Sequence, residues 1–172
     1  MNFLSRFALL FWLVGAAQAQ SATDYSLNDG AIRFKVPSDW SMILQKTEGS
    51  PQAIAFQVKD PADQGTDTAT RVTVDTRHFA DANEFASFVA SGMAKAKQIN
   101  SYTEEVGSND ATHLRYTGTD AGKRYQYRDM YLFRESLGIH VRCVRPLLPA
   151  TTSAWTKAYE QGCDLLMRSV QQ

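Results

Sequence analysis

The residues best suited to catalysis or metal binding are three histidines: His78, His113 and His140. None has a second histidine at helical spacing, and the chain contains neither an HExxH nor a paired CxxC motif, so no metal site is expected. The Gly-x-Ser-x-Gly turn of serine hydrolases and the glycine-rich phosphate loop are also missing. These observations favour a non-enzymatic protein with no cofactor, in which each histidine packs or is exposed on a strand.

Three aspartates occur in one polar segment, residues 60–70, together with Pro61 and Gly65. Asp60, Asp63 and Asp67 do not follow the alternating acidic pattern of a calcium-binding EF-hand loop. The segment is therefore predicted to be a surface loop with solvated carboxylates. A weak ion site in this loop is the alternative.

Arginines and tyrosines are concentrated between residues 115 and 145, and these two residue types anchor many protein interfaces. A polar turn, Gly107–Asp110, lies just before them and offers a hydroxyl, an amide and a carboxylate. We therefore predict that another protein binds at this turn and the adjoining sheet face. The predicted partner-binding residues are Ser108, Asn109, Asp110, Arg115, Arg124, Tyr125 and Arg128. The alternative is an ordinary turn beside a sheet face whose arginines pair with Asp120, Asp129 and Glu135.

The only two cysteines, Cys143 and Cys163, are expected to pair, because two cysteines in a small exported domain usually form a disulfide. Cys143 shares a strand face with Ile139 and Val141, and Cys163 belongs to an apolar helical stripe. Both side chains therefore point into the layer between sheet and helix. Two buried free thiols are the alternative. A disulfide would also exclude Cys143 as a nucleophile assisted by His140.

Two helices are predicted from apolar residues at helical spacing. The first covers residues 82–97, begins with a capping box at Asp81–Glu84, and buries the stripe that contains Phe85, Phe88, Val89 and Met93. The second follows Thr152 as its cap. Its buried stripe contains Trp155, Tyr159, Cys163, Leu166 and Val170.

Strands are predicted from alternating residues between turn signals, and the last four form an antiparallel meander. The predicted strands are residues 32–36, 41–45, 52–59, 71–79, 102–106, 111–117, 123–134 and 139–145. The fold class is therefore α+β, an antiparallel sheet flanked by helices in a single domain. Trp40 and Trp155 are predicted to be core anchors, and residues 20–24 a short polar tail.

The N-terminus has the pattern of a secretory signal peptide over residues 1–19. Arg6 precedes an apolar run that is too short to span a bilayer comfortably, and Ala17-Gln18-Ala19 offers a cleavage site. A retained membrane anchor is the alternative. Cleavage leaves one protein-binding domain, residues 20–172, with no membrane anchor, in the periplasm or outside the cell. Arg6 is the only charge removed, so a chain with 18 basic and 18 acidic residues becomes one with net charge −1. No nucleic-acid partner is expected.

The segment from Phe34 to Trp40 reads Phe-Lys-Val-Pro-Ser-Asp-Trp. This strand-Pro-x-x-Trp entry, with the order of elements that follows it, resembles the Mog1/PsbP-like superfamily, which includes the bacterial DcrB-like proteins. The resemblance implies an antiparallel sheet flanked by helices and a protein that binds other proteins. It supplies no site residue that transfers to a position of this chain.

The function that these observations favour is non-enzymatic protein binding outside the cytoplasm. A sharper hypothesis is a toxin immunity protein that neutralises a secreted, cell-wall-degrading effector hydrolase. The alternatives are a periplasmic hydrolase with an unrecognised site and a carrier of a small ligand.

Overall fold

The computed structural model describes residues 21–63, 70–105, 110 and 112–170. The predicted signal peptide lies outside these residues. The elements follow one another as β1 (Ala22–Leu27), β2 (Ile32–Pro37), β3 (Ser41–Lys46), β4 (Gln52–Val58), β5 (Thr70–His78), α1 (Ala82–Lys97), β6 (Asn100–Glu104), β7 (His113–Asp120), β8 (Lys123–Arg134), β9 (Leu137–Pro146) and α2 (Ser153–Val170). Within the described part of the chain, no helix is both long and apolar enough to cross a membrane.

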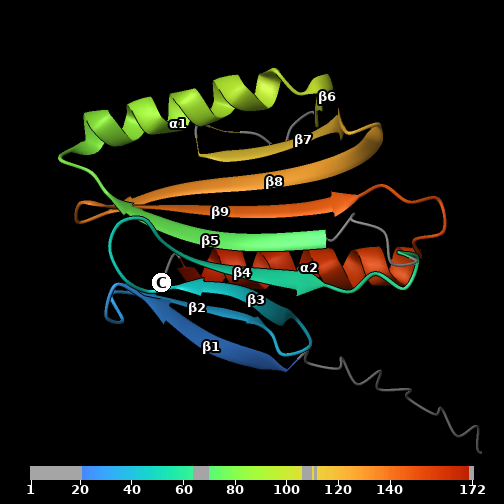
Figure 1. Ribbon diagram of the computed structural model, residues 1–172, viewed down its shortest axis with the longest axis horizontal. Coiled ribbons are helices and arrows are strands. Elements are labelled where there is room, and N and C mark those ends of the chain that lie inside the picture. Colours follow the sequence, from blue (N-terminus) through green and yellow to red (C-terminus); the bar gives the residue numbers. More distant parts are fainter. Residues whose placement is uncertain (1–20, 64–69, 106–109, 111, 171–172) are drawn as a thin grey trace, which may run out of the picture.

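Seven strands form one antiparallel sheet in the order β3-β4-β5-β9-β8-β7-β6, and β1 and β2 form a separate hairpin (Figure 1). The meander predicted from the sequence is thus the β6–β9 part of this sheet, with β9 pairing onward to β5. The predicted α+β class is confirmed. The predicted polar tail at residues 20–24 is wrong, because β1 begins at Ala22 and pairs with β2.

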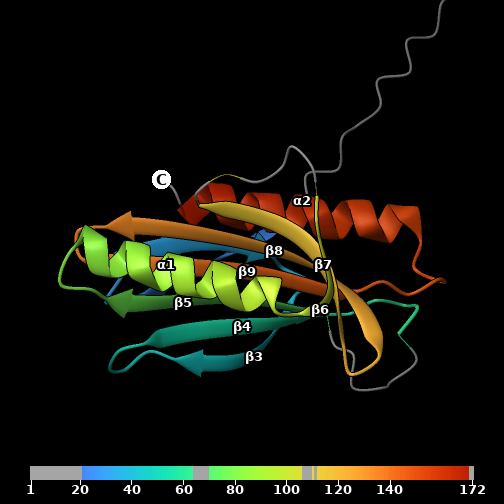
Figure 2. The same ribbon diagram turned by 90° about the horizontal axis from the view of Figure 1, so that it is seen from above.

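The two helices lie on opposite faces of the sheet (Figure 2). On the α2 side, alternate residues of β4, β5 and β9 meet Tyr159, Cys163, Leu166 and Val170, and the β1–β2 hairpin completes this core. On the α1 side, Phe85 and Val89 pack against an aromatic cluster from β7 and β8. Both predicted apolar helical stripes therefore face a core.

Local sequence signals explain where each helix begins. The Asp81 carboxylate accepts hydrogen bonds from the backbone N–H groups of Asn83 (2.8 Å) and Glu84 (2.9 Å), and the Glu84 side chain reaches back to the N–H of Ala80. The Asp81 half of the predicted capping box is thus present, whereas the Glu84 side chain bonds to the N–H of the residue before the cap and not to that of Asp81. The Thr152 hydroxyl accepts the N–H of Trp155 (3.2 Å) and caps α2 as expected.

The two tryptophans occupy different depths. Trp40 is buried, packs near Phe56 and Tyr159, and is a core anchor as predicted. Trp155 is half-buried, so its predicted role as a core anchor is only partly right. Its ring stacks on Tyr159 with centroids 5.3 Å apart, and its Nε1 donates to the carbonyl of Lys59 (2.9 Å). Trp155 therefore covers the core at its rim.

The β8–β9 connection is tighter than the sequence suggested. The predicted four-residue turn at Glu135–Gly138 is a two-residue hairpin, in which Glu135 and Ser136 both have positive φ. Gly138 instead lies within β9, where a Cβ atom would fall 2.2 Å from the Phe79 ring and 2.8 Å from the Phe85 ring. The glycine is needed for close packing, and the short turn fixes the register of β8 against β9.

Candidate partner-binding site

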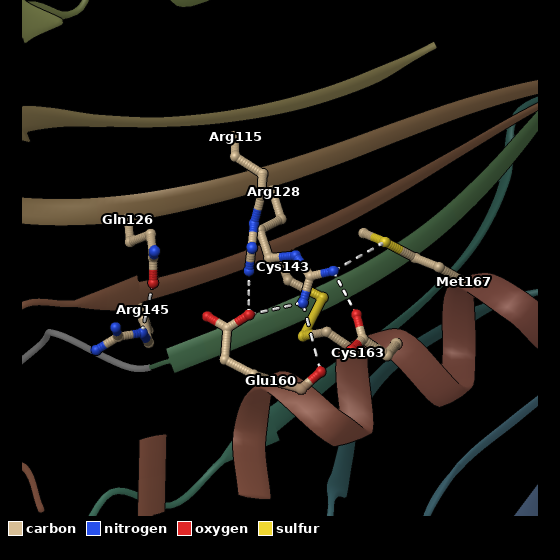
Figure 3. The surroundings of a disulfide bond; sticks show 9 residues. Arg115, Gln126, Arg128, Cys143, Arg145, Glu160, Cys163 and Met167 are labelled. Carbon is tan, nitrogen blue, oxygen red and sulfur yellow. Dashed lines mark hydrogen bonds and ion pairs between the residues drawn. A yellow bond between two sulfur atoms is a disulfide. The ribbon is translucent and has the colours of Figure 1, made fainter. Parts of the chain in front are cut away.

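Two of the predicted site arginines lie side by side on the sheet face that α2 covers. Arg115 of β7 and Arg128 of β8 are directly opposite each other, and Arg128 is in turn opposite Cys143 of β9. Side chains of one strand alternate between faces, so these three positions project toward α2. The predicted disulfide Cys143–Cys163 is present and joins β9 to α2 at this level (Figure 3).

Acidic residues of α2 meet these arginines. Glu160 and Asp164 are four residues apart and therefore share one side of the helix, flanking Cys163. Arg128 donates from Nη1 to Glu160 Oε2 (2.8 Å) and from Nη2 to Asp164 Oδ1 (2.5 Å), while Arg115 also pairs with Glu160 (Figure 3). The arginines are thus held by fixed partners, and they do not form an open positive patch.

A chain of polar contacts continues from this cluster along the sheet. Arg145 Nε donates to Gln126 Oε1 (2.8 Å), and Gln126 Nε2 donates to Glu105 Oε1 (2.7 Å). Glu105 Oε2 lies 3.8 Å from Arg115 Nε. The contacts fix the direction of each long side chain, so this edge of the α2 interface presents preorganised polar groups.

Asp110 ends the predicted binding turn and is held locally. Its carboxylate accepts the backbone N–H groups of Thr112 and His113, both at 2.7 Å, and the Thr112 hydroxyl at 2.9 Å. The hydrogen bond from the Thr112 backbone is the largest cause that holds the pKa of Asp110 well below its usual value. About two thirds of the side chain is exposed (65%), so a fixed negative charge faces solvent here.

A hollow of about 300 Å³ brings these residues together. It is lined by Asp110, His113, Leu114, Arg115, Arg128, Asp129 and Met167. Three predicted site residues, Asp110, Arg115 and Arg128, therefore share one concave surface. The hollow carries a carboxylate, guanidinium edges and a thioether, groups that suit hydrogen bonding and packing with a polypeptide.

The other predicted site residues are not gathered there. Ser108 and Asn109 lie outside the described residues. Arg124 is near the far end of the β7–β8 pair, where it is exposed and donates to the Thr117 hydroxyl (3.1 Å). Tyr125 projects from the opposite sheet face, with its ring 6.1 Å from that of Tyr127 in the cluster beneath α1.

A polar cluster that the sequence did not predict lies on the α1 side of the sheet. Asp129 is almost fully buried and accepts from His140 Nε2 (2.8 Å), from Arg142 Nε (2.7 Å) and Nη2 (3.1 Å), and from the Tyr116 hydroxyl (3.0 Å). Burial alone would raise the pKa of Asp129, but the hydrogen bonds from His140 and Arg142 outweigh it and lower the pKa to about 2. Asp129 therefore stays ionised.

His140 lies between two carboxylates. Its Nδ1 faces Asp75 Oδ2 at 3.0 Å while Nε2 faces Asp129, and its ring stacks on Tyr131. Burial lowers its pKa, but the hydrogen bonds to Asp129 and Asp75 prevail and raise it. Only an imidazole that is protonated at both Nδ1 and Nε2 can donate hydrogen bonds to both Asp75 and Asp129. With both nitrogens engaged, the imidazole is placed to hold charge inside the sheet, not to take a proton from a substrate.

Part of this cluster could be predicted from the sequence. The salt-bridge alternative named Asp129 as an arginine partner, and Arg142 does pair with it. A two-residue turn at Glu135–Ser136 places Asp129 opposite Arg142 by counting back along β8. The four-residue turn predicted at Glu135–Gly138 gives a different register, in which Asp129 is not opposite Arg142.

Metal binding finds no support among the described residues, where no group of three or more His, Cys, Asp or Glu side chains could hold an ion. Asp60 belongs to the segment predicted to be a surface loop with solvated carboxylates, and for this residue the prediction is wrong, because its side chain is buried. Its carboxylate accepts the N–H of Ala62 (2.9 Å) and the hydroxyl of Thr151 (2.6 Å), which ties the loop to the start of α2. Asp67 lies outside the described residues.

Comparison with known proteins supports the fold and leaves the family open. No protein-family model matches the sequence, and no curated protein matches it. The solved structure of LpqN, involved in cell envelope biogenesis of Mycobacterium tuberculosis, is similar with a TM-score of 0.54 and 12% identity, over 91% of this chain and 85% of LpqN. The solved structure of PA94 of Pseudomonas aeruginosa, a protein of unknown function, has a TM-score of 0.49 and 15% sequence identity, over 84% of this chain and 95% of PA94. The chain thus shares the fold of LpqN, and the Mog1/PsbP-like resemblance stays a prediction.

Proposed function

We propose that this chain is an exported, non-enzymatic domain that binds another protein in the cell envelope. The observation that carries the proposal is the hollow in which Asp110, Arg115 and Arg128 meet. Their positions are set by backbone hydrogen bonds, by ion pairs with α2 and by the disulfide. Groups that are already ordered lose little conformational entropy when a partner binds, so such a surface favours association.

Two further observations support a location in the envelope. The Cys143–Cys163 disulfide fits an oxidising compartment, as the sequence pattern of residues 1–19 does. The fold is also that of LpqN, a protein involved in cell envelope biogenesis. Envelope biogenesis is therefore one process in which a partner should be sought.

The sharper form of the proposal is toxin immunity against a secreted effector hydrolase. Asp110 supports this form, because its exposed carboxylate, whose pKa is held low by the backbone hydrogen bonds, can pair with cationic or hydrogen-bonding groups in the active site of such an enzyme. The other residues that line the hollow would then contact the surface around the active site of the enzyme. In this form, the captured partner is a cell-wall hydrolase whose activity falls as one equivalent of this chain is added.

The experiment is a pull-down of the purified chain from envelope and periplasmic extracts, followed by mass spectrometry of the captured proteins. Asp110→Asn keeps an oxygen for the backbone N–H groups and removes the charge, so it serves as the site variant. Arg124→Gln changes an exposed residue outside the hollow and serves as its control. A partner captured by the wild type and Arg124→Gln, and lost with Asp110→Asn, supports the proposal. Equal capture by all three contradicts it.

A further inference from the structure

A second hollow lies where the β1–β2 hairpin meets the ends of β8 and α2, and we call it the hairpin hollow. It measures about 410 Å³, and its lining includes three basic side chains, one carboxylate and one hydroxyl: Arg33, Lys35, Arg134, Asp24 and Ser169. In Figure 1 the β1–β2 turn, the β8–β9 turn and the end of α2 lie at the same end of the molecule. None of its lining residues belongs to the hollow that contains Asp110, so the two are separate surfaces.

The strand pattern of β2 places two of the basic residues there. The alternate apolar residues of β2 are buried in the core, so Arg33 and Lys35 project outward on the other side of the strand. The backbone N–H of Lys35 donates to the Ser169 hydroxyl (2.8 Å), which fixes β2 against the last turn of α2. Arg134, the last residue of β8, joins them from the large sheet. Three separate elements thus bring positive charge to one place.

The charges that line the hairpin hollow do not balance. Three cations face one carboxylate, that of Asp24, so the lining carries a net charge of +2. Asp24 Oδ1 is 3.8 Å from Lys35 Nζ, and the two side chains are 79% and 54% exposed, so water weakens this ion pair. The whole chain has equal numbers of basic and acidic residues, and the predicted cleavage changes that balance by one charge. The positive potential is therefore a local property of this surface.

Both guanidinium groups are oriented by uncharged partners. Arg33 Nε donates to the carbonyl of Gly30 (3.1 Å), and Arg134 Nη2 donates to the carbonyl of Val170 at the end of α2 (3.2 Å). Such bonds fix the direction of a guanidinium without neutralising it, although the negative end of the α2 dipole offsets part of the charge of Arg134. Among the described residues, neither group forms an ion pair. Three other arginines of the sheet do pair with carboxylates: Arg115, Arg128 and Arg142.

We propose that the hairpin hollow binds a phosphate group. A guanidinium presents its N–H donors in a planar fork that matches phosphate oxygens, and a lysine ammonium binds phosphate as a point charge. Arg33 and Arg134 each keep N–H donors beyond the one bonded to a carbonyl. A phosphomonoester carries a charge of about −2 near neutral pH, which balances the lining, whereas a carboxylate would balance only half of it. Phosphate then competes with Asp24 for Lys35.

Calorimetric titration of the purified chain with inorganic phosphate at about pH 8, where phosphate is mainly a dianion, tests the proposal. Arg33→Gln removes a charge at an exposed position and should weaken binding by about tenfold or more. Asp24→Asn removes the competing carboxylate and should tighten binding by about two- to fivefold. Arg124→Gln removes an exposed charge outside the hollow and should bind phosphate like the wild type.

Vesicles distinguish the two sources of such a phosphate. The chain is sedimented with phosphatidylcholine vesicles that contain or lack phosphatidic acid, whose headgroup is a phosphomonoester. Sedimentation that requires phosphatidic acid and is lost with Arg33→Gln assigns the site to a lipid headgroup. Phosphate binding without vesicle binding assigns it to a soluble phosphorylated ligand. The proposal is overturned if phosphate up to about 10 mM gives no saturable heat, or if Arg33→Gln and Arg124→Gln have the same affinity for phosphate.

Discussion

Arg128 of β8 and Glu160 of α2 form an ion pair between the sheet and the helix, with Nη1 and Oε2 2.8 Å apart. The Arg128 side chain is 12% exposed, so little water screens the pair. The pair lies beside the disulfide (Figure 3), and its Arg128 also lines the candidate hollow. The same contact therefore holds α2 in place and positions a predicted binding residue.

Breaking that pair from one side should be destabilising. Arg128→Ala removes one partner of the half-buried Glu160, which keeps its ion pair with Arg115, so the loss should be about 1–3 kcal/mol. Urea denaturation should show this loss, and Arg124→Ala, at an exposed position, should change the free energy of unfolding by less than about 0.5 kcal/mol. A double-mutant cycle with Glu160→Gln isolates the coupling of the pair. Additive effects in the cycle would mean that the two residues act independently.

The disulfide should contribute substantially to stability. Cys143 and Cys163 are 20 residues apart, and closing a loop of this length stabilises a fold by roughly 3 kcal/mol in the chain-entropy account. Replacing both cysteines with serine should therefore lower the melting temperature by about 6–12 °C for a chain of this size. Reductant should destabilise the wild type and leave the double-serine variant unchanged. A wild type that is insensitive to reductant would contradict this prediction.

The two tryptophans should respond differently to truncation. Trp40→Ala empties a buried site between Phe56 and Tyr159 and should cost about 3–5 kcal/mol. Trp155→Ala removes a half-buried ring that stacks on Tyr159 at the surface, so its effect should be clearly smaller. Thermal unfolding of both variants compares them directly. Equal losses would show that Trp155 is as important to the core as Trp40.

Stability should fall at mildly alkaline pH because of His140. Its pKa is raised in the folded state by the hydrogen bonds to Asp129 and Asp75, against the opposing effect of burial. A raised folded pKa means that the stabilisation is fully present below the unfolded value, about 6.5, and is lost as pH rises through the folded value. Denaturation between pH 5 and 9 should show this decline in the wild type.

The matched variants assign that decline to one residue. His140→Gln should remove most of the pH dependence, whereas His78→Gln, at an exposed position, should retain it. Proton NMR of the imidazole should place the midpoint of His140 above 6.5. A midpoint below that value would show that burial outweighs the two carboxylates.

The sequence predicted most of the architecture because its signals were local. Apolar spacing and the Asp81 cap were sufficient to predict α1, and alternation from Lys123 to Arg134 predicted β8. The β1 strand was missed because its residues are mostly exposed and gain their structure by pairing with β2. Glu160 and Asp164 were not recognised as partners of the meander, because their contact depends on how α2 crosses the sheet.

The candidate site was predicted less completely than the fold. Residue types identified Asp110, Arg115 and Arg128, which share the hollow. Alternation along the predicted strand 123–134 already places Tyr125 on the face opposite to Arg128, and the prediction of the site did not apply it. The pairing of Arg115 with Arg128, by contrast, requires the register between β7 and β8. The exposed apolar residues of β3 were read as an ordinary strand, since only the strand order shows that β3 is an edge.

The most direct test of the central claim is the dissociation constant of the captured partner for three forms of this chain. The account predicts that Asp110→Asn weakens binding at least tenfold, about 1.4 kcal/mol, whereas Arg124→Gln binds like the wild type. Circular dichroism and thermal unfolding should confirm that both variants are folded. Dissociation constants that agree for all three forms would contradict a binding site at the hollow.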